Sequence, residues 1–292
     1  MSSAPAVLFD VPGPKTIARH RLYTVVAAVV VVAVVAFAIW RLYAEQQFEY
    51  DKWEPFLTPS YVEALLVDGV VTTLQMAFTS VFLAVVFGVV FGMGKLSDHW
   101  WVRWPSWAVV EFFRAVPVLL MMILVFYTYG IDRGTSGAYW SVVVALTVYN
   151  GAVLAEVFRA GILAVPAGQA EAAYAIGMRK TQVMSLILLP QAVKIMLPAI
   201  ISQCVVTLKD TSLGYAVAAP GLTAVGKQIY GGFNNQIPTV MVLAVIYIVI
   251  NLVLTAVATW VQKKFVGEKD PLEVSMVGLT EPGTGQVSAR GH

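Results

Sequence analysis

The sequence predicts an all-α integral membrane protein with six transmembrane helices. Its 292 residues are 59% hydrophobic and only 12% charged, and the mean hydropathy is +0.76. Soluble domains carry roughly 45–50% apolar and about 25% charged residues. Six apolar segments are each long enough to cross a bilayer, which takes about 20 residues in a helix. A soluble fold of this size could not bury so much apolar surface, so we expect one polytopic membrane domain.

The ionisable residues argue against several classes of function. The formal net charge is only +2, which provides no basic footprint for nucleic acid. Cys204 is the single cysteine, so no intrachain disulfide can form, and its apolar surroundings predict a small buried hydrophobic residue. His20, His99 and His292 fall in expected loops or tails, and no His-Glu-x-x-His or Gly-x-Ser-x-Gly pattern occurs. We therefore expect no catalytic residue and no metal site, which argues against an intramembrane enzyme.

The first 66 residues are expected to form one extra span with polar flanks. Residues 1–21 are polar and basic and are predicted to be a cytoplasmic segment. The apolar run 22–42 contains no acidic residue. It is too long for the core of a signal peptide and lacks an Ala-x-Ala-like cleavage site, so we expect it to be retained as a transmembrane helix. Residues 43–66 are acidic and contain Trp53 and Pro55, which predicts an irregular extracytoplasmic connector.

Five further spans are predicted in the region 67–265, at residues 67–94, 105–129, 139–163, 193–218 and 238–261. Gly88 and Gly92 in the first of them form a small-residue pattern typical of close helix packing. A Gly-Lys pair that follows superficially resembles a phosphate-binding loop. However, Val89 stands where that loop requires glycine, and Leu96 stands where it requires Ser or Thr. The chain therefore has no ATPase motif of its own.

Three regions lie between or after these spans. The loop 164–192 is a polar interval bordered by Pro166 and Pro190. The Gly-rich, amphipathic stretch 219–235 predicts a short helix at the outer surface. Residues 266–292 become rich in Gly, Ser and Pro, which predicts a disordered cytoplasmic tail.

The distribution of Lys and Arg predicts that both termini lie in the cytoplasm. With the N-terminus inside, twelve basic residues fall on inside segments and four on outside ones, and the opposite orientation inverts this ratio. The inside set is Lys15, Arg19, Arg21, Lys95, Arg103, Arg159, Arg179, Lys180, Lys194, Lys263, Lys264 and Lys269. The outside set is Arg41, Lys52, Arg133 and Lys227. The loop 164–192 is therefore expected to face the cytoplasm.

The loop 164–192 can form a thin helix that a partner could grip. Gly168 can start the helix, and Glu171 is expected in its first turn, where a carboxylate suits the positive end of the helix dipole. The alanines that follow keep the helix thin, and Gly177 can end it in a left-handed conformation. A second helix from about Lys180 would lead into the next span. A plain connecting loop with a surface helix is the alternative, since short Ala-rich helices are common.

The spacing in this loop resembles the cytoplasmic coupling motif of ABC-importer permeases. All seven motif positions match: Glu171, Ala172, Ala173, Gly177, Ile187, Leu189 and Pro190. The resemblance implies that these residues, together with Gly168, dock onto a separate ATPase.

The resemblance extends to permeases of the polar amino acid uptake family from Asp68 to about Phe265. The matching segments are Asp68-Gly69-x-x-x-Thr73-Leu74, Glu111-Phe112-Phe113-Arg114-Ala115-Val116-Pro117, Ala155-Glu156-Val157-Phe158-Arg159-Ala160-Gly161 and Leu208-Lys209-Asp210-Thr211-Ser212-Leu213. The second segment departs from the family pattern, because Ala115 and Val116 replace Gly and Thr. The first 65 residues lie outside the usual five-span core. Their extra span, their start Phe9-Asp10-x-Pro12-Gly13-Pro14 and their connector Gln47-Phe48…Lys52-Trp53-Glu54-Pro55-Phe56 resemble glutamate-type permeases of actinobacteria.

This resemblance implies a type I ABC importer permease core of five helices plus one extra N-terminal span in the cell membrane. The chain would bind no cofactor, because ATP and Mg belong to the partner ATPase. The implied partners are two ATPase subunits, a second and different permease subunit, an extracytoplasmic amino acid binding protein and membrane lipid. Glutamate or another polar amino acid is the implied substrate.

Charged and polar groups inside the spans are candidates for the substrate pathway, because charges in a bilayer are costly. The candidates are Glu111, Arg114, Asn150, Lys209, Asp210, Thr211 and Ser212. An amino acid substrate needs a cation for its carboxylate and an acceptor for its ammonium group. The alternative is that Glu111–Arg114 and Lys209–Asp210 are internal pairs that fix helix positions.

Two further interpretations stay open from the residues alone. Glu156 and Arg159 are three residues apart near the cytoplasmic end of a span, which favours an inner gate or an anchor for the loop. An ion-driven secondary transporter is the alternative function. Such folds usually contain two related halves with paired broken helices. The sequence contains one basic loop with a Glu-Ala-Ala motif, at 164–192, and no second copy of it.

Overall fold

The computed structural model describes residues 13–266, and every regular element in that range is helical. The predicted all-α class is confirmed. The chain divides into two units, which are described separately. Within the described residues, the first contains 13–72 and 220–246, and the second contains 73–219 and 247–266.

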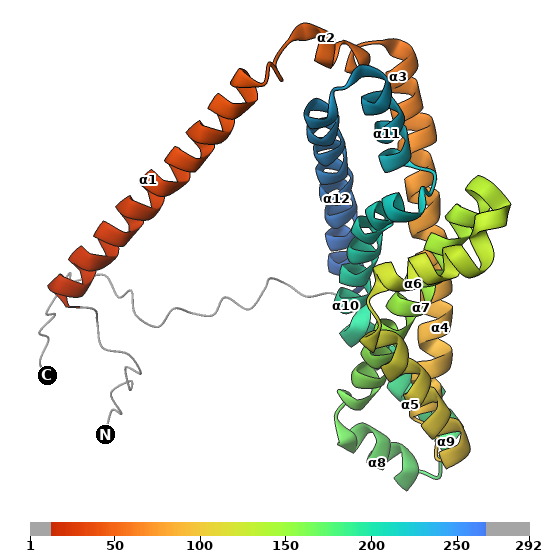
Figure 1. The fold of residues 1–292 in the computed structure, drawn as a ribbon. Coiled ribbons are helices and arrows are strands. Elements are labelled where there is room, and N and C mark those ends of the chain that lie inside the picture. The colour runs from red at the N-terminus through yellow and green to blue at the C-terminus, as the bar shows by residue number, and fades with distance from the viewer. Residues whose placement is uncertain (1–12, 267–292) are drawn as a thin grey trace, which may run out of the picture. The chain divides into compact units, whose positions relative to one another are not determined.

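The first unit begins with α1 (Pro14–Ala44), one uninterrupted helix of 31 residues (Figure 1). A proline stands in its first turn, where the missing N–H costs no hydrogen bond. At 1.5 Å per residue its length is about 46 Å, which exceeds the roughly 30 Å of a hydrocarbon core. The apolar stretch of α1 has no side chain buried by the described chain. Its apolar surface is therefore free to contact lipid.

The connector after α1 is built from short helical turns and not from irregular chain. They are α2 (Tyr50–Trp53), the 3₁₀ turn η1 (Glu54–Phe56) and α3 (Pro59–Glu63), which runs on into the π-helical η2 (Ala64–Val71). The helix α11 (Leu222–Phe233) packs against η2, where a Cβ on Gly69 would lie 3.1 Å from Leu222. The Asn235 amide donates a hydrogen bond of 2.7 Å to the carbonyl of Lys52. The predicted short helix within 219–235 is thus present.

The second unit is organised around α7 (Gly134–Leu163). This helix packs against α10 (Leu189–Asp210), α6 (Val118–Val125) and α5 (Trp100–Ala115). Buried side chains from several turns of α7, among them Val142, Leu146 and Leu154, enter the apolar clusters that join these helices. The last helix, α12 (Gln236–Val266), belongs to the first unit up to Ile246 and to the second from Tyr247.

Small residues let α4 (Thr72–Lys95) approach α7 closely. A Cβ added to Gly88 would lie 2.8 Å from the Leu154 Cβ, and one added to Gly92 would lie 2.9 Å from the Ala155 carbonyl oxygen. Helices in a bilayer associate through such close packing, because lipid tails are as apolar as the side chains. The packing role predicted for these two glycines is confirmed.

The predicted third span, 105–129, is not one helix. α5 ends at Ala115, Val116 is extended (φ −85°, ψ 126°), and α6 starts after Pro117. The cause is local, because proline disfavours the helical conformation of the residue before it. α6 is followed by a π-helical turn, η3 (Phe126–Gly130), and by the 3₁₀ turn η4 (Ile131–Arg133).

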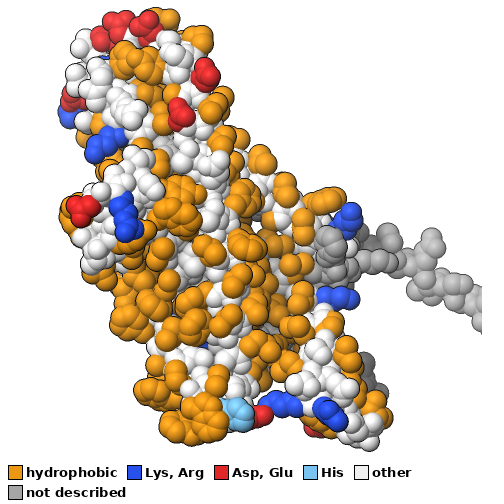
Figure 2. Space-filling model, turned by 90° about the vertical axis from the view of Figure 1, so that its right-hand side faces the viewer, with side chains coloured by type: hydrophobic (Ala, Val, Ile, Leu, Met, Phe, Trp, Pro, Cys, Tyr) orange, Lys and Arg blue, Asp and Glu red, His pale blue; other side chains and the backbone are white. Residues whose placement is uncertain are grey.

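Among residues 13–266, five helical stretches are long and apolar enough to cross a membrane. They are Lys15–Ala44, Pro59–Lys95, Val118–Leu163, Lys180–Val217 and Gln236–Lys264. The third of these folds back on itself, because α6 packs against α7. Exposed hydrophobic side chains cover much of the visible surface (Figure 2). These features establish a multi-pass membrane protein, and the sixth crossing stays a prediction.

Candidate functional site

The predicted coupling segment contains a short, exposed helix. α8 (Ala167–Ala175) follows Pro166, and Ala173 is its one buried residue. Its neighbours Glu171 and Ala172 are exposed, and Ile176 just beyond the helix is 80% exposed. Glu171 does not lie in the first turn as expected, because the helix already starts at Ala167, directly after the proline. Its carboxylate therefore projects from the second turn into solvent.

Gly177 ends α8 with a fixed left-handed cap, as predicted. Its φ is +83°, a conformation that costs other residues about 1–2 kcal/mol. The Gly177 N–H donates to the Tyr174 carbonyl at 2.9 Å, and the Met178 N–H donates to the Ala173 carbonyl at 3.2 Å. This pair of bonds is a Schellman motif, which satisfies carbonyls at the helix end.

The second half of the segment is continuous with a span. The helical turn α9 (Lys180–Gln182) leads without a break through the π-helical η5 (Val183–Leu188) into α10. Val183 is fully buried, and α8 packs against η5. Ile187 is half-buried, whereas Leu189 and Pro190 are exposed. α8 therefore contacts a helical stretch that continues into α10.

An ion pair ties the coupling segment to the loop between α4 and α5. Lys180 pairs with Asp98 across 82 positions of sequence. The hydrogen bond and charge of Lys180 lower the pKa of the Asp98 carboxyl. Both side chains are exposed, so solvent and salt screen the pair.

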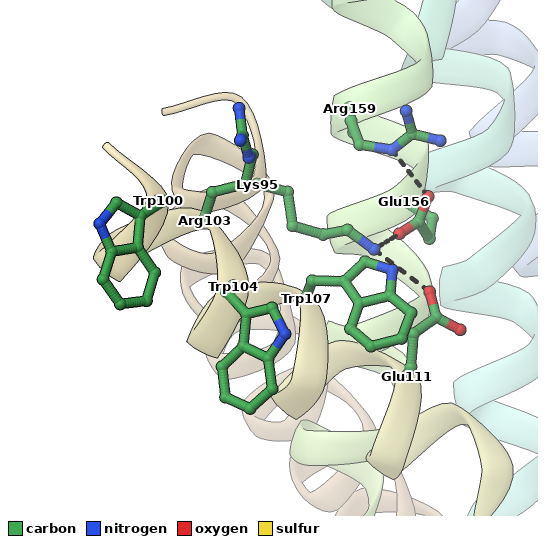
Figure 3. Close-up of a pocket in the computed structure, with 8 residues that line it drawn as sticks. All are labelled: Lys95, Trp100, Arg103, Trp104, Trp107, Glu111, Glu156 and Arg159. Carbon is green, nitrogen blue, oxygen red and sulfur yellow. Dashed lines mark hydrogen bonds and ion pairs between the residues drawn. The ribbon is translucent and has the colours of Figure 1, made fainter. Parts of the chain in front are cut away.

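Five charged residues form an alternating chain that joins α4, α5 and α7. Lys95 donates to Glu111 at 3.2 Å and also pairs with Glu156. Arg114 lies 3.3 Å from Glu111, and Arg159 lies 3.0 Å from Glu156. Figure 3 shows the Lys95 ammonium group between the two carboxylates. Each carboxylate thus has two cations, and the two carboxylates around Lys95 offset the desolvation of its buried ammonium group.

Lys95 is the residue that the sequence interpretation missed. Its side chain is 6% exposed, the least among these five. A lysine at the end of an apolar run usually extends into water, and the partners lie 16 and 61 positions away. No local spacing reveals such a contact. The predicted Glu111–Arg114 and Glu156–Arg159 pairs are both present.

A cavity of about 690 Å³ adjoins this charge network. Three tryptophans of α5 line one part of it, and the charged lining residues are Lys95, Arg103, Glu111, Glu156 and Arg159 (Figure 3).

Asn150, a candidate for the substrate pathway, lies buried between α7 and α10. It is fully buried on α7, where its amide donates to the Leu146 carbonyl at 2.9 Å. Its oxygen accepts a hydrogen bond of 2.5 Å from Gln203 of α10. Both polar atoms of Asn150 are therefore used between two helices.

The charged end of α10 differs from the expected ion pair. Within residues 13–266, no ion pair joins Lys209 to Asp210, because adjacent helix residues point in different directions. α10 ends at Asp210, and the 3₁₀ turn η6 (Thr211–Val217) follows. The Thr211 hydroxyl donates to the Leu208 carbonyl and the Ser212 hydroxyl to the Lys209 carbonyl, each at 2.7 Å. Both hydroxyl groups thus donate to backbone carbonyls in the last turn of α10.

These features define a class: a polytopic helical membrane protein with an exposed helix between two of its spans. Comparison with known proteins specifies it further. Residues 84–267, more than half of the chain, match the family of binding-protein-dependent transport system inner membrane components. The chain belongs to this family, and the amino acid permease resemblance inferred from its motifs is confirmed.

Individual relatives support the same assignment. The glutamate transport system permease protein GluD of Corynebacterium glutamicum is 41% identical over 221 residues, which cover 75% of this chain and 81% of GluD. The glutamate/aspartate import permease protein GltK of Escherichia coli is 30% identical over 226 residues, which cover 74% of this chain and 99% of GltK. A crystal structure of an amino acid ABC transporter with histidines has a TM-score of 0.66 at 27% identity. The structural match covers 72% of this chain and 98% of the chain in that crystal structure.

Proposed function

We propose that this chain is the glutamate-type permease subunit of an ATP-driven importer, and that residues 164–192 couple its spans to a separate ATPase. The observation that carries the proposal is that α8 packs against η5, and that α9, η5 and α10 form one helical stretch. A thin, exposed helix closed by a rigid cap can enter a groove of a partner. Because η5 and α10 are one helical stretch, the partner's movement would reach the membrane domain directly.

The family and the relatives support the remaining parts of the proposal. The importer would contain two ATPase subunits that hold ATP and Mg, a second and different permease subunit, and an extracytoplasmic amino acid binding protein. The chain would lie in the cell membrane with both termini in the cytoplasm, as the Lys and Arg distribution predicts. The docking residues would be Gly168, Glu171, Ala172, Ala173, Gly177, Ile187, Leu189 and Pro190.

The candidate pathway residues divide into two groups. Glu111 and Arg114 belong to the charge network, so we assign them, with Glu156 and Arg159, to holding α4, α5 and α7 in register. Lys209 is exposed and Asp210 half-buried, and neither forms an ion pair within residues 13–266. These two remain our candidates for the carboxylate and ammonium groups of the substrate.

Charge reversal on α8 tests the coupling proposal. Glu171→Lys should abolish uptake of labelled glutamate while the importer subunits still co-purify, because the carboxylate is exposed and forms no ion pair within residues 13–266. Glu63→Lys reverses another exposed glutamate outside this segment and should leave uptake near the wild-type rate. Normal uptake by Glu171→Lys, with normal assembly, would refute the coupling role.

Uptake that survives ATP depletion under a maintained ion gradient would favour a secondary transporter.

Competition tests the substrate. Cells lacking or carrying this subunit are given labelled glutamate and challenged with aspartate, glutamine, histidine or arginine. We expect competition by glutamate and aspartate. Competition by the basic amino acids alone would reject glutamate while leaving the permease assignment intact.

A further inference from the structure

The first turns of α5 present a cluster of exposed tryptophans. Trp100, Trp101 and Trp104 are 66%, 60% and 64% exposed, and Trp107 is 51% exposed. Large aromatic side chains rarely face water in such density. Indole rings with one polar N–H gather at the level of lipid headgroups in membrane proteins. The cluster therefore indicates that this part of α5 lies at a membrane–water interface.

The cavity beside these tryptophans is cationic. Trp100, Arg103, Trp104 and Trp107 follow the spacing i, i+3, i+4, i+7 along α5, which places them on one face of the helix. Within residues 13–266, Arg103 takes part in no ion pair. The five charged residues of the lining are three cations and two carboxylates, and both carboxylates are already paired with Lys95. Arg103, whose charge also acts on the exposed Asp98, thus lines a space bounded by indole rings and has no ion-paired carboxylate there.

We propose that this cavity binds the phosphate headgroup of an anionic phospholipid. The Arg103 guanidinium would contact the phosphate, since its planar donors match phosphate geometry. The glycerol and the first acyl carbons would lie along the rings of Trp100 and Trp104. An inorganic anion would gain nothing from the indole walls, so the combined chemistry favours a lipid over a soluble anion. The Lys and Arg distribution assigns the site to the cytoplasmic leaflet, whose anionic lipids attract basic residues near the surface.

Brominated lipids test this site directly, because bromine quenches tryptophan fluorescence on contact. The full chain is placed in phosphatidylcholine nanodiscs with an equal small fraction of either brominated phosphatidylglycerol or brominated phosphatidylcholine. We expect stronger quenching by the brominated anionic lipid, carried largely by Trp104 and therefore reduced in Trp104→Phe. Arg103→Gln should bring the two lipids to equal quenching. Arg103→Lys should keep a preference, and Arg179→Gln, a matched loss of an exposed arginine, should keep it fully.

Three results would overturn the proposal. Equal quenching by the two lipids in the wild-type chain would exclude headgroup selection. An undiminished preference in Arg103→Gln, at an unchanged melting temperature, would place the selection elsewhere. Loss of the preference on adding millimolar inorganic phosphate would assign the cavity to a soluble anion. None of these measurements involves transport, so the outcome is independent of the substrate and of the coupling segment.

Discussion

At the scale of single residues, Lys95 connects three helices. Its ammonium group lies between Glu111 and Glu156 and is almost fully buried. Lys95→Met would leave both carboxylates in a weakly solvated place with only their arginine partners. Removal of one partner from a buried ion pair costs about 3–5 kcal/mol, and partial exposure of both carboxylates reduces this to about 1–3 kcal/mol. Thermal unfolding of the purified chain in detergent measures the loss.

The control for Lys95 is Lys194→Met, which removes an exposed lysine that forms no ion pair within residues 13–266. Equal melting temperatures for the two variants would show that the network has no role in stability. Adding Glu156→Gln to Lys95→Met should recover part of the loss, because an amide is far less costly to leave unpaired than a carboxylate.

The ion pair between Asp98 and Lys180 is exposed to solvent, so we expect it to stabilise the fold less than the buried ion pairs of Lys95. Because the pKa of Asp98 is lowered in the folded chain, the pair stabilises at pH values above the ordinary aspartate pKa of about 3.9. This contribution disappears as the pH falls through the lower folded value. At neutral pH and low salt, Asp98→Asn should speed hydrogen exchange in residues 178–185. High salt should have the same effect on the wild-type chain, and a salt response that persists in Asp98→Asn would contradict the assignment.

At the scale of helices, close packing of α4 on α7 depends on glycine. A methyl group on Gly88 would lie 2.8 Å from the Leu154 Cβ and 2.9 Å from the Phe158 ring. Gly88→Ala should therefore lower stability by about 1–3 kcal/mol, the usual cost of overpacking. Gly231→Ala is the matched control, because nothing lies within 4 Å of an added Cβ there. It should be neutral or slightly stabilising, and a similar loss in both variants would exclude the packing explanation.

Helix positions were predictable where a local rule controls them. The left-handed cap of Gly177 and the glycine face of α4 follow from the residues themselves. The break at Val116–Pro117 also obeys a local rule, but the apolar run across it predicts an unbroken span. α8 starts at Ala167, one residue before the expected Gly168, and this shift moves Glu171 from the first turn into the second. Lys95 was beyond prediction, because its partners meet it only after α4, α5 and α7 have packed.

At the scale of the whole molecule, the long apolar runs predict the membrane class but not the role of each helix. α1 and α7 are both long apolar helices in the sequence. In the structure, the apolar stretch of α1 has no side chain buried by the described chain, whereas α7 is buried along most of its length. Composition cannot make this distinction, because lipid and protein are equally apolar surroundings for such side chains.

The orientation of the whole chain can be tested with its single cysteine removed. In a Cys204→Ser background, Ser185→Cys and Ser136→Cys place one thiol at an exposed site in the coupling segment or in the first turn of α7. The twelve-to-four excess of Lys and Arg predicts that Ser185→Cys faces the cytoplasm and Ser136→Cys the outside. In intact cells, a membrane-impermeant maleimide should therefore label Ser136→Cys at once and Ser185→Cys only after permeabilisation. Labelling in the reverse order would show that the chain has the opposite orientation in the membrane. α8 would then lie outside the cell and could not reach a cytoplasmic ATPase.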